Sequence, residues 1–174
     1  MALLKRSDIK RRPRLKPGYY AFRVIRAEAK VSQSGNDMFK LILEDLEGTG
    51  TIGYFIVLIP KMAYQLLDFC EAANLQLPDD DDAQLVLERF HFEGRYVYGQ
   101  VIEEEETDRV NLKRIFTREE ALKKAPRLAS VTVPENPPLA IPVVRPGSLP
   151  PPIRPAKPRT QDPDLDGEPD DIPF

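Results

Sequence analysis

The sequence lacks most of the side chains from which catalytic and metal centres are built. Cys70 is the single cysteine and His91 the single histidine among 174 residues. An internal disulfide, a histidine-based zinc site and a Ser-His-Asp triad therefore lack the necessary parts. No GxxxxGK[ST] loop is present to bind phosphates. We expect a protein that is not an enzyme and that uses no cofactor or metal.

Long apolar runs are also missing, because none approaches the roughly 20 residues that a membrane helix needs. Cys70 lies in an apolar helical pattern and is expected to be a small core residue. A lone, buried cysteine is compatible with a reducing, cytoplasmic location. We therefore expect no membrane partner.

Proline is scarce in the first part of the chain and frequent in the last part. Only four of the 18 prolines precede residue 126. Proline removes a backbone donor and interrupts helices and central strands. We therefore expect a folded domain over residues 17–125, followed by a disordered, proline-rich linker over residues 126–161.

Charge is segregated at the two ends of the sequence. Residues 5–16 hold seven basic residues and one acidic residue, whereas residues 162–174 hold six acidic residues and no basic one. Residues 1–16 are expected to be a flexible basic arm, which is either a phosphate-binding strap or a solvated tail. Residues 162–174 are expected to be an acidic tail.

The acidic tail ends in an apolar element. Acidic disordered segments are normally poor in aromatic residues, so Phe174 indicates a docking function. Its ring, beside its own α-carboxylate, fits an apolar pocket that has an arginine or lysine at its rim. Ile172 adds a second apolar contact, and Pro173 restricts the backbone before binding.

Hydrophobic periodicity between the two ends predicts three strands, one helix and then two strands. Residues 83–90 fit either a short helix or a strand. The expected strands are 18–32, 37–48, 51–59, 92–104 and 108–116, the expected main helix is 60–75, and the expected closing helix is 118–125. This is the element order of an OB-fold, a five-stranded, partly open barrel with its helix between strands three and four. The predicted class is all-β with one main helix and a disordered C-terminal tail.

Two stretches resemble the single-stranded DNA-binding proteins (SSB) of bacteria and phages. GYYAFRVIRAEAKVSQSGNDMFKLIL is similar to the opening of small phage-encoded replication and recombination proteins, and PDDIPF is similar to the SSB C-terminal tip, with Pro169 in place of one aspartate. The chain has no tryptophan, whereas the stacking residues of cellular SSB include tryptophans.

The resemblance implies a protein that coats single-stranded DNA during replication, recombination or repair in the bacterial host cytoplasm. It also implies recruitment of partner proteins, and a homo-oligomer is compatible with it. The expected partner-binding residues are Asp170, Asp171, Ile172, Pro173 and Phe174.

Binding of single strands without sequence preference needs a cationic groove and aromatic faces on which bases stack. Tyr96 and Tyr98 alternate with Val97, which is expected to point inward, so both tyrosines are expected to point outward. Tyr19 and Phe55 are further aromatic candidates. The predicted DNA-binding residues are Arg23, Arg26, Lys30, Phe39, Lys40, Tyr54, Arg95, Tyr96, Tyr98, Arg109, Lys113 and Arg114, and the aromatic residues assigned to the core are Phe22, Phe92 and Phe116.

The net charge of the predicted domain opposes DNA binding. Residues 17–131 hold 14 basic and 20 acidic residues, so binding requires a segregated basic face. The acidic runs 79–82 and 103–106 lack the ligand spacing of a calcium loop and are expected to be solvated loops. The alternative function is that of an adaptor or decoy, which captures host replication proteins through the tail without binding DNA.

Overall fold

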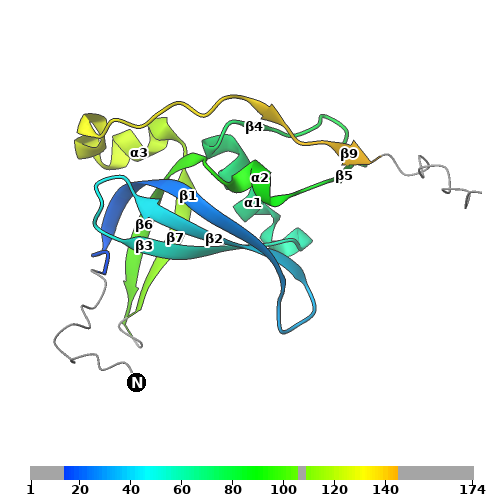
Figure 1. Ribbon diagram of the computed structural model, residues 1–174, viewed down its shortest axis with the longest axis horizontal. Helices are drawn as coiled ribbons and strands as arrows, with labels where there is room; N and C mark the ends of the chain where they lie inside the picture. The colour runs from blue at the N-terminus through cyan, green and yellow to red at the C-terminus, as the bar shows by residue number, and fades with distance from the viewer. Residues whose placement is uncertain (1–13, 106–108, 145–174) are drawn as a thin grey trace, which may run out of the picture.

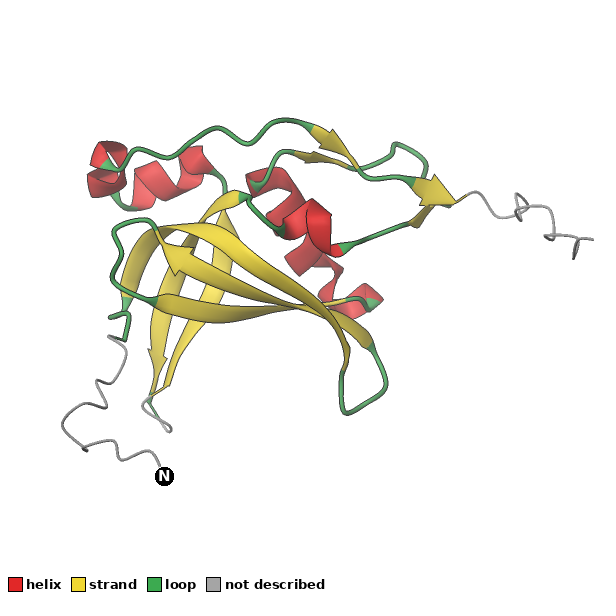
Figure 2. Ribbon diagram, in the orientation of Figure 1, coloured by secondary structure: helices red, strands yellow, loops and turns green. Residues whose placement is uncertain are grey.

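Five antiparallel strands form the main sheet of the protein. The computed structural model describes residues 14–105 and 109–144. The sheet has the order β3-β2-β1-β6-β7 (Figures 1 and 2). Its strands are β1 (Gly18–Val31), β2 (Asp37–Asp45), β3 (Thr51–Val57), β6 (Tyr96–Glu104) and β7 (Arg109–Phe116). The five strands expected from periodicity are confirmed.

Shorter elements connect and cover these strands. Both expected helices are present, and residues 83–90 contain a short strand and the start of a short helix. The elements are η2 (Pro60–Met62), α1 (Ala63–Ala72), β4 (Leu75–Gln76), β5 (Gln84–Leu85), α2 (Arg89–Phe92), α3 (Arg118–Lys124), η3 (Pro126–Ser130), β8 (Leu139–Ala140) and β9 (Val143–Val144). The main helix α1 thus follows the third strand, as expected.

The sheet curls at β1, because the two halves of this strand pair with different neighbours on either side of a bulge. The first half of β1 pairs with β6 and the second half pairs with β2, with a β-bulge between Val24 and Arg26. A bulge increases the local twist and bends the strand. Strands β3 and β7, at the two ends of the sheet order, come into contact with each other. Both edges of the sheet therefore meet around one interior.

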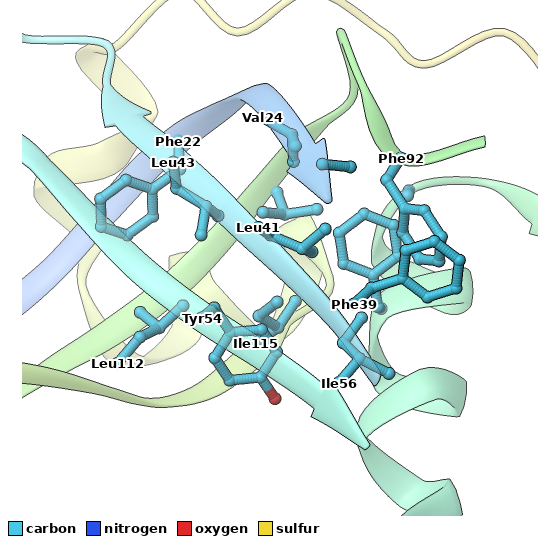
Figure 3. Packing of buried hydrophobic residues seen from close by; sticks show 14 of the residues in the cluster. Phe22, Val24, Phe39, Leu41, Leu43, Tyr54, Ile56, Phe92, Leu112 and Ile115 are labelled. Carbon is cyan, nitrogen blue, oxygen red and sulfur yellow. The ribbon is translucent and has the colours of Figure 1, made fainter. Parts of the chain in front are cut away.

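The interior is filled by alternating residues of all five strands (Figure 3). Phe39, Leu41 and Leu43 share the inner face of β2, because alternate residues of a strand point to the same side. Phe22 and Phe92 are fully buried, which confirms their assignment to the core. Cys70 is also a core residue, and burial raises the pKa of its thiol to about 12.

Strand β3 is buried on one face only, although its sequence is apolar on both. A nearly continuous apolar run is typical of a strand that is covered on both faces, but the structure buries only Ile52, Tyr54 and Ile56. Gly53 and Phe55 point outward. The reason is that β3 packs its inner face on the core and leaves its outer face to solvent, which is common in antiparallel sheets.

A second apolar cluster covers part of the outer face of the sheet. Helix α3 and the 3-10 helix η3 pack there on Ala21, Tyr98 and Phe116, and Phe116 is thereby confirmed as buried. The Thr117 hydroxyl caps α3 by accepting a hydrogen bond from the backbone N–H of Glu120. One half of the outer face, over β1, β6 and β7, is therefore covered.

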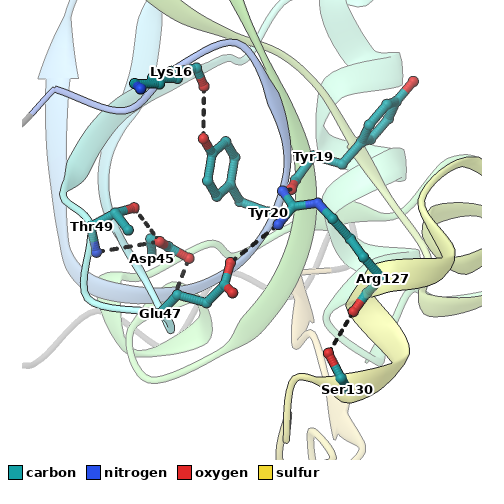
Figure 4. Close-up of polar contacts among 8 residues, drawn as sticks. All are labelled: Lys16, Tyr19, Tyr20, Asp45, Glu47, Thr49, Arg127 and Ser130. Atoms are coloured by element: carbon teal, nitrogen blue, oxygen red, sulfur yellow. Dashed lines mark hydrogen bonds and ion pairs between the residues drawn. The ribbon is translucent and has the colours of Figure 1, made fainter.

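Polar contacts fix this cover to the strands (Figure 4). Arg127 donates to the Tyr19 carbonyl and pairs with Glu47, whose carboxylate lies 3.5 Å away in the β2–β3 turn.

The Tyr20 hydroxyl donates to the Lys16 carbonyl at 2.9 Å, and Leu15 is buried. The predicted flexible arm thus packs on the domain at residues 14–16.

Residues 126–144 belong to the folded part, which corrects the predicted start of the linker. Figure 1 shows this segment running from α3 past β4 to β9. Strand β8 pairs in parallel with β4, and β9 pairs with β5. Ile141 enters the core. The two short strands follow Pro138 and Pro142 directly, and they pair at sheet edges, where proline is tolerated.

Other predicted segments lie outside the described residues. These are residues 1–13 of the basic arm, residues 145–161 of the linker and the whole acidic tail, 162–174. The expected partner-binding residues Asp170 to Phe174 belong to that tail. Their role stays a prediction from the sequence.

Gly99 is required by the packing of the interior. A Cβ at this position would lie 2.5 Å from Leu112 Cδ1 and 3.3 Å from Phe22 Cε2. We expect Gly99→Ala to lower the free energy of unfolding by about 1–3 kcal/mol, because Leu112 must leave its rotamer. Urea denaturation measures the effect. Gly53→Ala is the control, because its Cβ would meet only the Leu41 carbonyl, at 4.0 Å, and an unchanged Gly99→Ala protein would contradict this packing.

Candidate nucleic-acid interface

The half of the outer face that α3 and η3 leave uncovered is the candidate site, called here the open face. It consists of the outward residues of β2, β3 and the second half of β1. Cross-strand pairing arranges them in rows. The rows are Lys30–Met38–Val57, Glu28–Lys40–Phe55, Arg26–Ile42–Gly53 and Arg23–Glu44–Thr51. Charged side chains therefore lie on β1, uncharged ones lie on β3, and β2 between them carries both kinds.

The open face is cationic although the domain is acidic. Arg23, Arg26, Lys30 and Lys40 oppose only Glu28 and Glu44 on this face. All four predicted cations on β1 and β2 are thus brought together on one surface. The described acidic residues of the 79–82 and 103–105 runs lie in other parts of the fold, in the β4–β5 connection and at the end of β6. The required segregation of charge is present.

Glu28 partly neutralises this face. Its carboxylate lies 2.7 Å from Arg26 Nη2 and 3.2 Å from Lys30 Nζ. The hydrogen bond from Lys30, together with the charges of Arg26, Lys30 and Lys40, lowers the pKa of Glu28. The carboxylate therefore stays ionised near neutral pH, where it competes with any anionic ligand for Arg26 and Lys30.

Phe55 supplies the exposed aromatic ring of the open face. Its side chain is 44% exposed, and Lys40 is its direct cross-strand neighbour. Directly opposite side chains in a sheet approach within about 5 Å at Cβ. Beside Phe55 lies a shallow pocket that Gly53, Gln65 and Asn111 help to line. The arrangement offers an apolar ring, a cation and amide groups to a single ligand.

Gln65 has a fixed orientation at this pocket. Its Oε1 accepts a hydrogen bond from the backbone N–H of Val57, at 3.4 Å. Because a backbone N–H can only donate, the side-chain oxygen must face Val57. The amide nitrogen of Gln65 is therefore free to donate on its other side.

Four predicted DNA-binding residues are buried, which corrects their assignment. Phe39 packs on Phe92 with ring centroids 4.6 Å apart, and Tyr54 lies in the same core. Burial raises the pKa of Tyr54 to about 12, with Asp68 adding to the effect. Tyr98 lies beneath α3 and η3, where burial raises the pKa of its hydroxyl. None of these rings has a face open for stacking.

Arg95 is the fourth buried residue. Its Nη1 donates to the Ala73 carbonyl at 3.4 Å and to the Pro137 carbonyl. Burial lowers the pKa of its guanidinium. Arg95 therefore connects α1 to residues 131–144, and its role is structural.

The remaining predicted residues lie at the margins of the open face. Tyr96 is half-buried on β6, directly opposite Arg23. Arg109 and Lys113 are exposed on β7, which adjoins β3. Arg114 is engaged by Asp68 at 2.9 Å and lies over the Phe116 ring. Tyr19, the further aromatic candidate, packs on Phe116.

Gly53 and Gln65 were not found from the sequence, and Phe55 was only a further candidate. The sequence does place Phe55 and Gly53 on the same side of their strand, because they are two residues apart. Gln65 carries no local signal, because its position depends on how α1 packs beside β3.

No protein-family model and no curated protein matches this chain. Among the described residues, no helix is long and apolar enough to cross a membrane. No group of three or more His, Cys, Asp or Glu side chains in that part of the chain is arranged to hold a metal ion.

Proposed function

We propose that the protein is a non-enzymatic, non-sequence-specific single-stranded DNA-binding protein, and that its DNA site is the open face. The observation that carries the proposal is Phe55, an exposed ring on β3 that lies directly opposite Lys40, on a face that holds four cations in an otherwise acidic domain. A stacking ring and a cationic track are the two features that binding of single strands requires. The roles in DNA replication, recombination or repair rest on the sequence resemblance.

We infer further that the domain is an OB-fold barrel. Its five long strands follow the order three-two-one-four-five, with the main helix between the third and the fourth. The contact between β3 and β7 supports closure of the sheet. In this fold, the outer face of strands two and three is the usual surface for oligonucleotides. The open face occupies the same place.

Fluorescence anisotropy with labelled oligo-dT tests the proposal. We expect saturable binding that weakens by up to about fiftyfold for a fourfold rise in salt, because four cations displace counterions from the single strand. Phe55→Ala is expected to weaken binding about tenfold through loss of stacking. Phe90→Ala is the matched control, since this ring is also exposed but lies on α2.

The alternative is an adaptor or decoy that uses the tail alone. It predicts no saturable binding of oligo-dT at either salt concentration. Equal affinities of the wild-type protein and Phe55→Ala would leave a DNA-binding protein but would remove the open face as its site.

Removal of the carboxylate of Glu28 should strengthen DNA binding. In Glu28→Gln, Arg26 and Lys30 lose their acidic partner and become available to phosphates. We expect an affinity gain of about three- to tenfold at low salt, which disappears at high salt. Because the pKa of Glu28 is lowered, acidification of the wild-type protein should produce this gain only below the usual titration range of glutamate.

Glu71→Gln provides the control for this experiment. Glu71 is exposed on α1, so its substitution makes the same change in net charge away from the open face. Anisotropy titrations of both variants separate local from bulk electrostatics. An equal gain for the two would show that only net charge matters.

For the tail, we propose that Asp170, Asp171, Ile172, Pro173 and Phe174 recruit DNA-processing partners. The support is the resemblance of these residues to the SSB tip. The apolar side chains would fill a pocket on the partner, and the aspartates would steer the tail towards a basic surface. The coated strand and the partner are then held together by one chain, which raises the local concentration of the partner.

Deletion of Phe174 is expected to reduce partner capture at least tenfold and to leave the affinity for oligo-dT unchanged. The reason is that the ring supplies the main apolar anchor of the tip. Capture of bacterial replication and repair proteins on immobilised protein, compared with anisotropy, measures both properties. Leu165→Ala, which removes an apolar residue upstream in the same acidic tail, is the control. Undiminished capture without Phe174 would contradict the role of the tip.

A further inference from the structure

A pocket lies on the margin of the open face, next to the β6 residue that pairs with Arg23. Tyr96, Arg118 and Glu135 line it, together with Asn74 and Val133. Its volume is about 230 Å³. The lining comes from α1, β6, α3 and the segment 131–144, so the pocket exists only because that segment packs on the domain.

Hydrogen bonds of Asn136 hold the pocket lining together on the side of Tyr96. The Asn136 amide accepts a hydrogen bond from the Tyr96 N–H at 2.8 Å and donates to the Tyr96 carbonyl at 2.7 Å. The same amide donates to the Ala72 carbonyl at 3.3 Å. The Asn136 side chain thus makes the two hydrogen bonds to the Tyr96 backbone that a neighbouring strand would otherwise make. These bonds involve only the backbone of Tyr96, which leaves its side chain free to serve the pocket.

The polar groups of the pocket have mixed character. Arg118 can only donate and forms no ion pair with the other described residues, whereas the Glu135 carboxylate can only accept. The charge of Arg118 reaches the Tyr98 hydroxyl and opposes the rise in its pKa. One cation and one carboxylate leave the lining with no net charge. Such a lining suits a neutral planar group with both donors and acceptors better than it suits a phosphate.

We propose that this pocket binds one unpaired nucleobase of a DNA strand that crosses the open face. The inference rests on the proposed function and extends it by naming a base subsite. Tyr96 provides the ring beside which the base lies, and Arg118 and Glu135 bind its polar edge.

The path to this pocket follows the rows of the sheet. Arg23 lies between Glu44 of the open face and Tyr96, with which it forms direct cross-strand pairs. Arg23 is exposed and forms no ion pair with the other described residues, so its guanidinium is available to a phosphate. Three strand spacings and four residues of rise separate Phe55 from Tyr96, which corresponds to a surface path of roughly 20 Å. One continuous strand therefore reaches both aromatic residues.

A length series of oligo-dT with Tyr96→Ala tests the subsite. Site sizes range from about four to about sixteen nucleotides for one OB fold, which sets the lengths to compare. For the shortest oligonucleotides, which occupy the open face only, we expect equal affinities for the wild type and the variant. For the longest, we expect Tyr96→Ala to bind about tenfold more weakly.

Tyr96→Phe is the matched variant, because it keeps the ring and should keep most of the affinity for long oligonucleotides. Arg118→Gln removes the cation at the base edge and should show the same length dependence as Tyr96→Ala. Thermal denaturation checks that all variants are folded.

The outcomes distinguish the subsite from the proposed function. Equal binding of Tyr96→Ala and the wild type at every length would overturn the subsite and leave DNA binding intact. A uniform loss at all lengths would also overturn it, because Tyr96 would then belong to the open face itself. Absence of binding by the wild-type protein would overturn both proposals.

Discussion

Arg95→Met is expected to lower the free energy of unfolding by about 2–4 kcal/mol. The guanidinium of Arg95 is buried, and it donates to carbonyls of Ala73 and Pro137, which belong to segments far apart in the sequence. Methionine preserves the apolar stem but leaves both carbonyls without this donor. A buried acceptor that loses a charged donor costs more than an ordinary surface hydrogen bond.

The loss should appear first in the segment that Arg95 anchors. The amides of Leu139 and Ile141 are bonded to the Asn74 and Gln76 carbonyls, at 3.3 and 3.0 Å. We expect faster hydrogen exchange at these amides in Arg95→Met than in the wild type, by more than at the amides of β2. Urea denaturation measures the global loss.

Arg23→Met is the control for Arg95→Met. Arg23 is exposed on β1, so its loss should change stability by less than about 0.5 kcal/mol while it weakens the binding of oligo-dT. A stability of Arg95→Met equal to that of the wild type would mean that Arg95 does not hold the 131–144 segment.

The strands were predictable because their signal is local. Alternation of apolar and polar residues specifies a strand and its inner face without knowledge of the rest of the chain. Phe39 lies on the same side of its strand as Leu41 and Leu43, so its burial follows from the same alternation. The sequence therefore already contained the information that contradicts the assignment of Phe39 to the DNA site.

The inner face of strand β3 does not follow from its sequence. Apolar residues occur on both sides of this strand, so periodicity does not decide whether Tyr54 or Phe55 points into the core. The choice is made by pairing, because Tyr54 lies opposite Leu41, on the inner face, and Phe55 lies opposite Lys40, on the outer face. A shift of one residue in register would exchange them.

The burial of Arg95 and Tyr98 depends on residues that are distant in sequence. The alternation correctly places Val97 and Val101 inside, so Tyr98 does point to the outer face. That face is covered there by α3 and η3. Arg95 is covered by residues 131–144, whose prolines favoured a linker. No local sequence pattern predicts either contact, because both depend on where α3, η3 and residues 131–144 pack on the sheet.

Gly53→Val is expected to abolish most DNA binding without loss of stability. Gly53 lies on the open face, directly opposite Ile42 of β2 and two residues before Phe55 on its own strand. A Cβ at Gly53 would meet only the Leu41 carbonyl, at 4.0 Å, and its φ lies outside the left-handed region. Neither packing nor backbone geometry requires glycine here. Valine has the higher strand propensity and should stabilise the fold by up to about 1 kcal/mol.

If DNA binds the open face as proposed, close approach of the strand gives this glycine a role. On the proposed path from Phe55 towards Arg23, the DNA strand crosses the row of Gly53 and Ile42, where a branched side chain would hold it away from the sheet. We expect the affinity of Gly53→Val for oligo-dT to fall more than tenfold by anisotropy, while its urea midpoint stays equal or rises. Thr51→Val, on the same strand and face but at its edge, should bind almost as the wild type does. Normal affinity of Gly53→Val would show that the strand of DNA does not cross β3 at Gly53. If Thr51→Val lost as much affinity as Gly53→Val, added bulk anywhere on β3 would be harmful and Gly53 would have no special role.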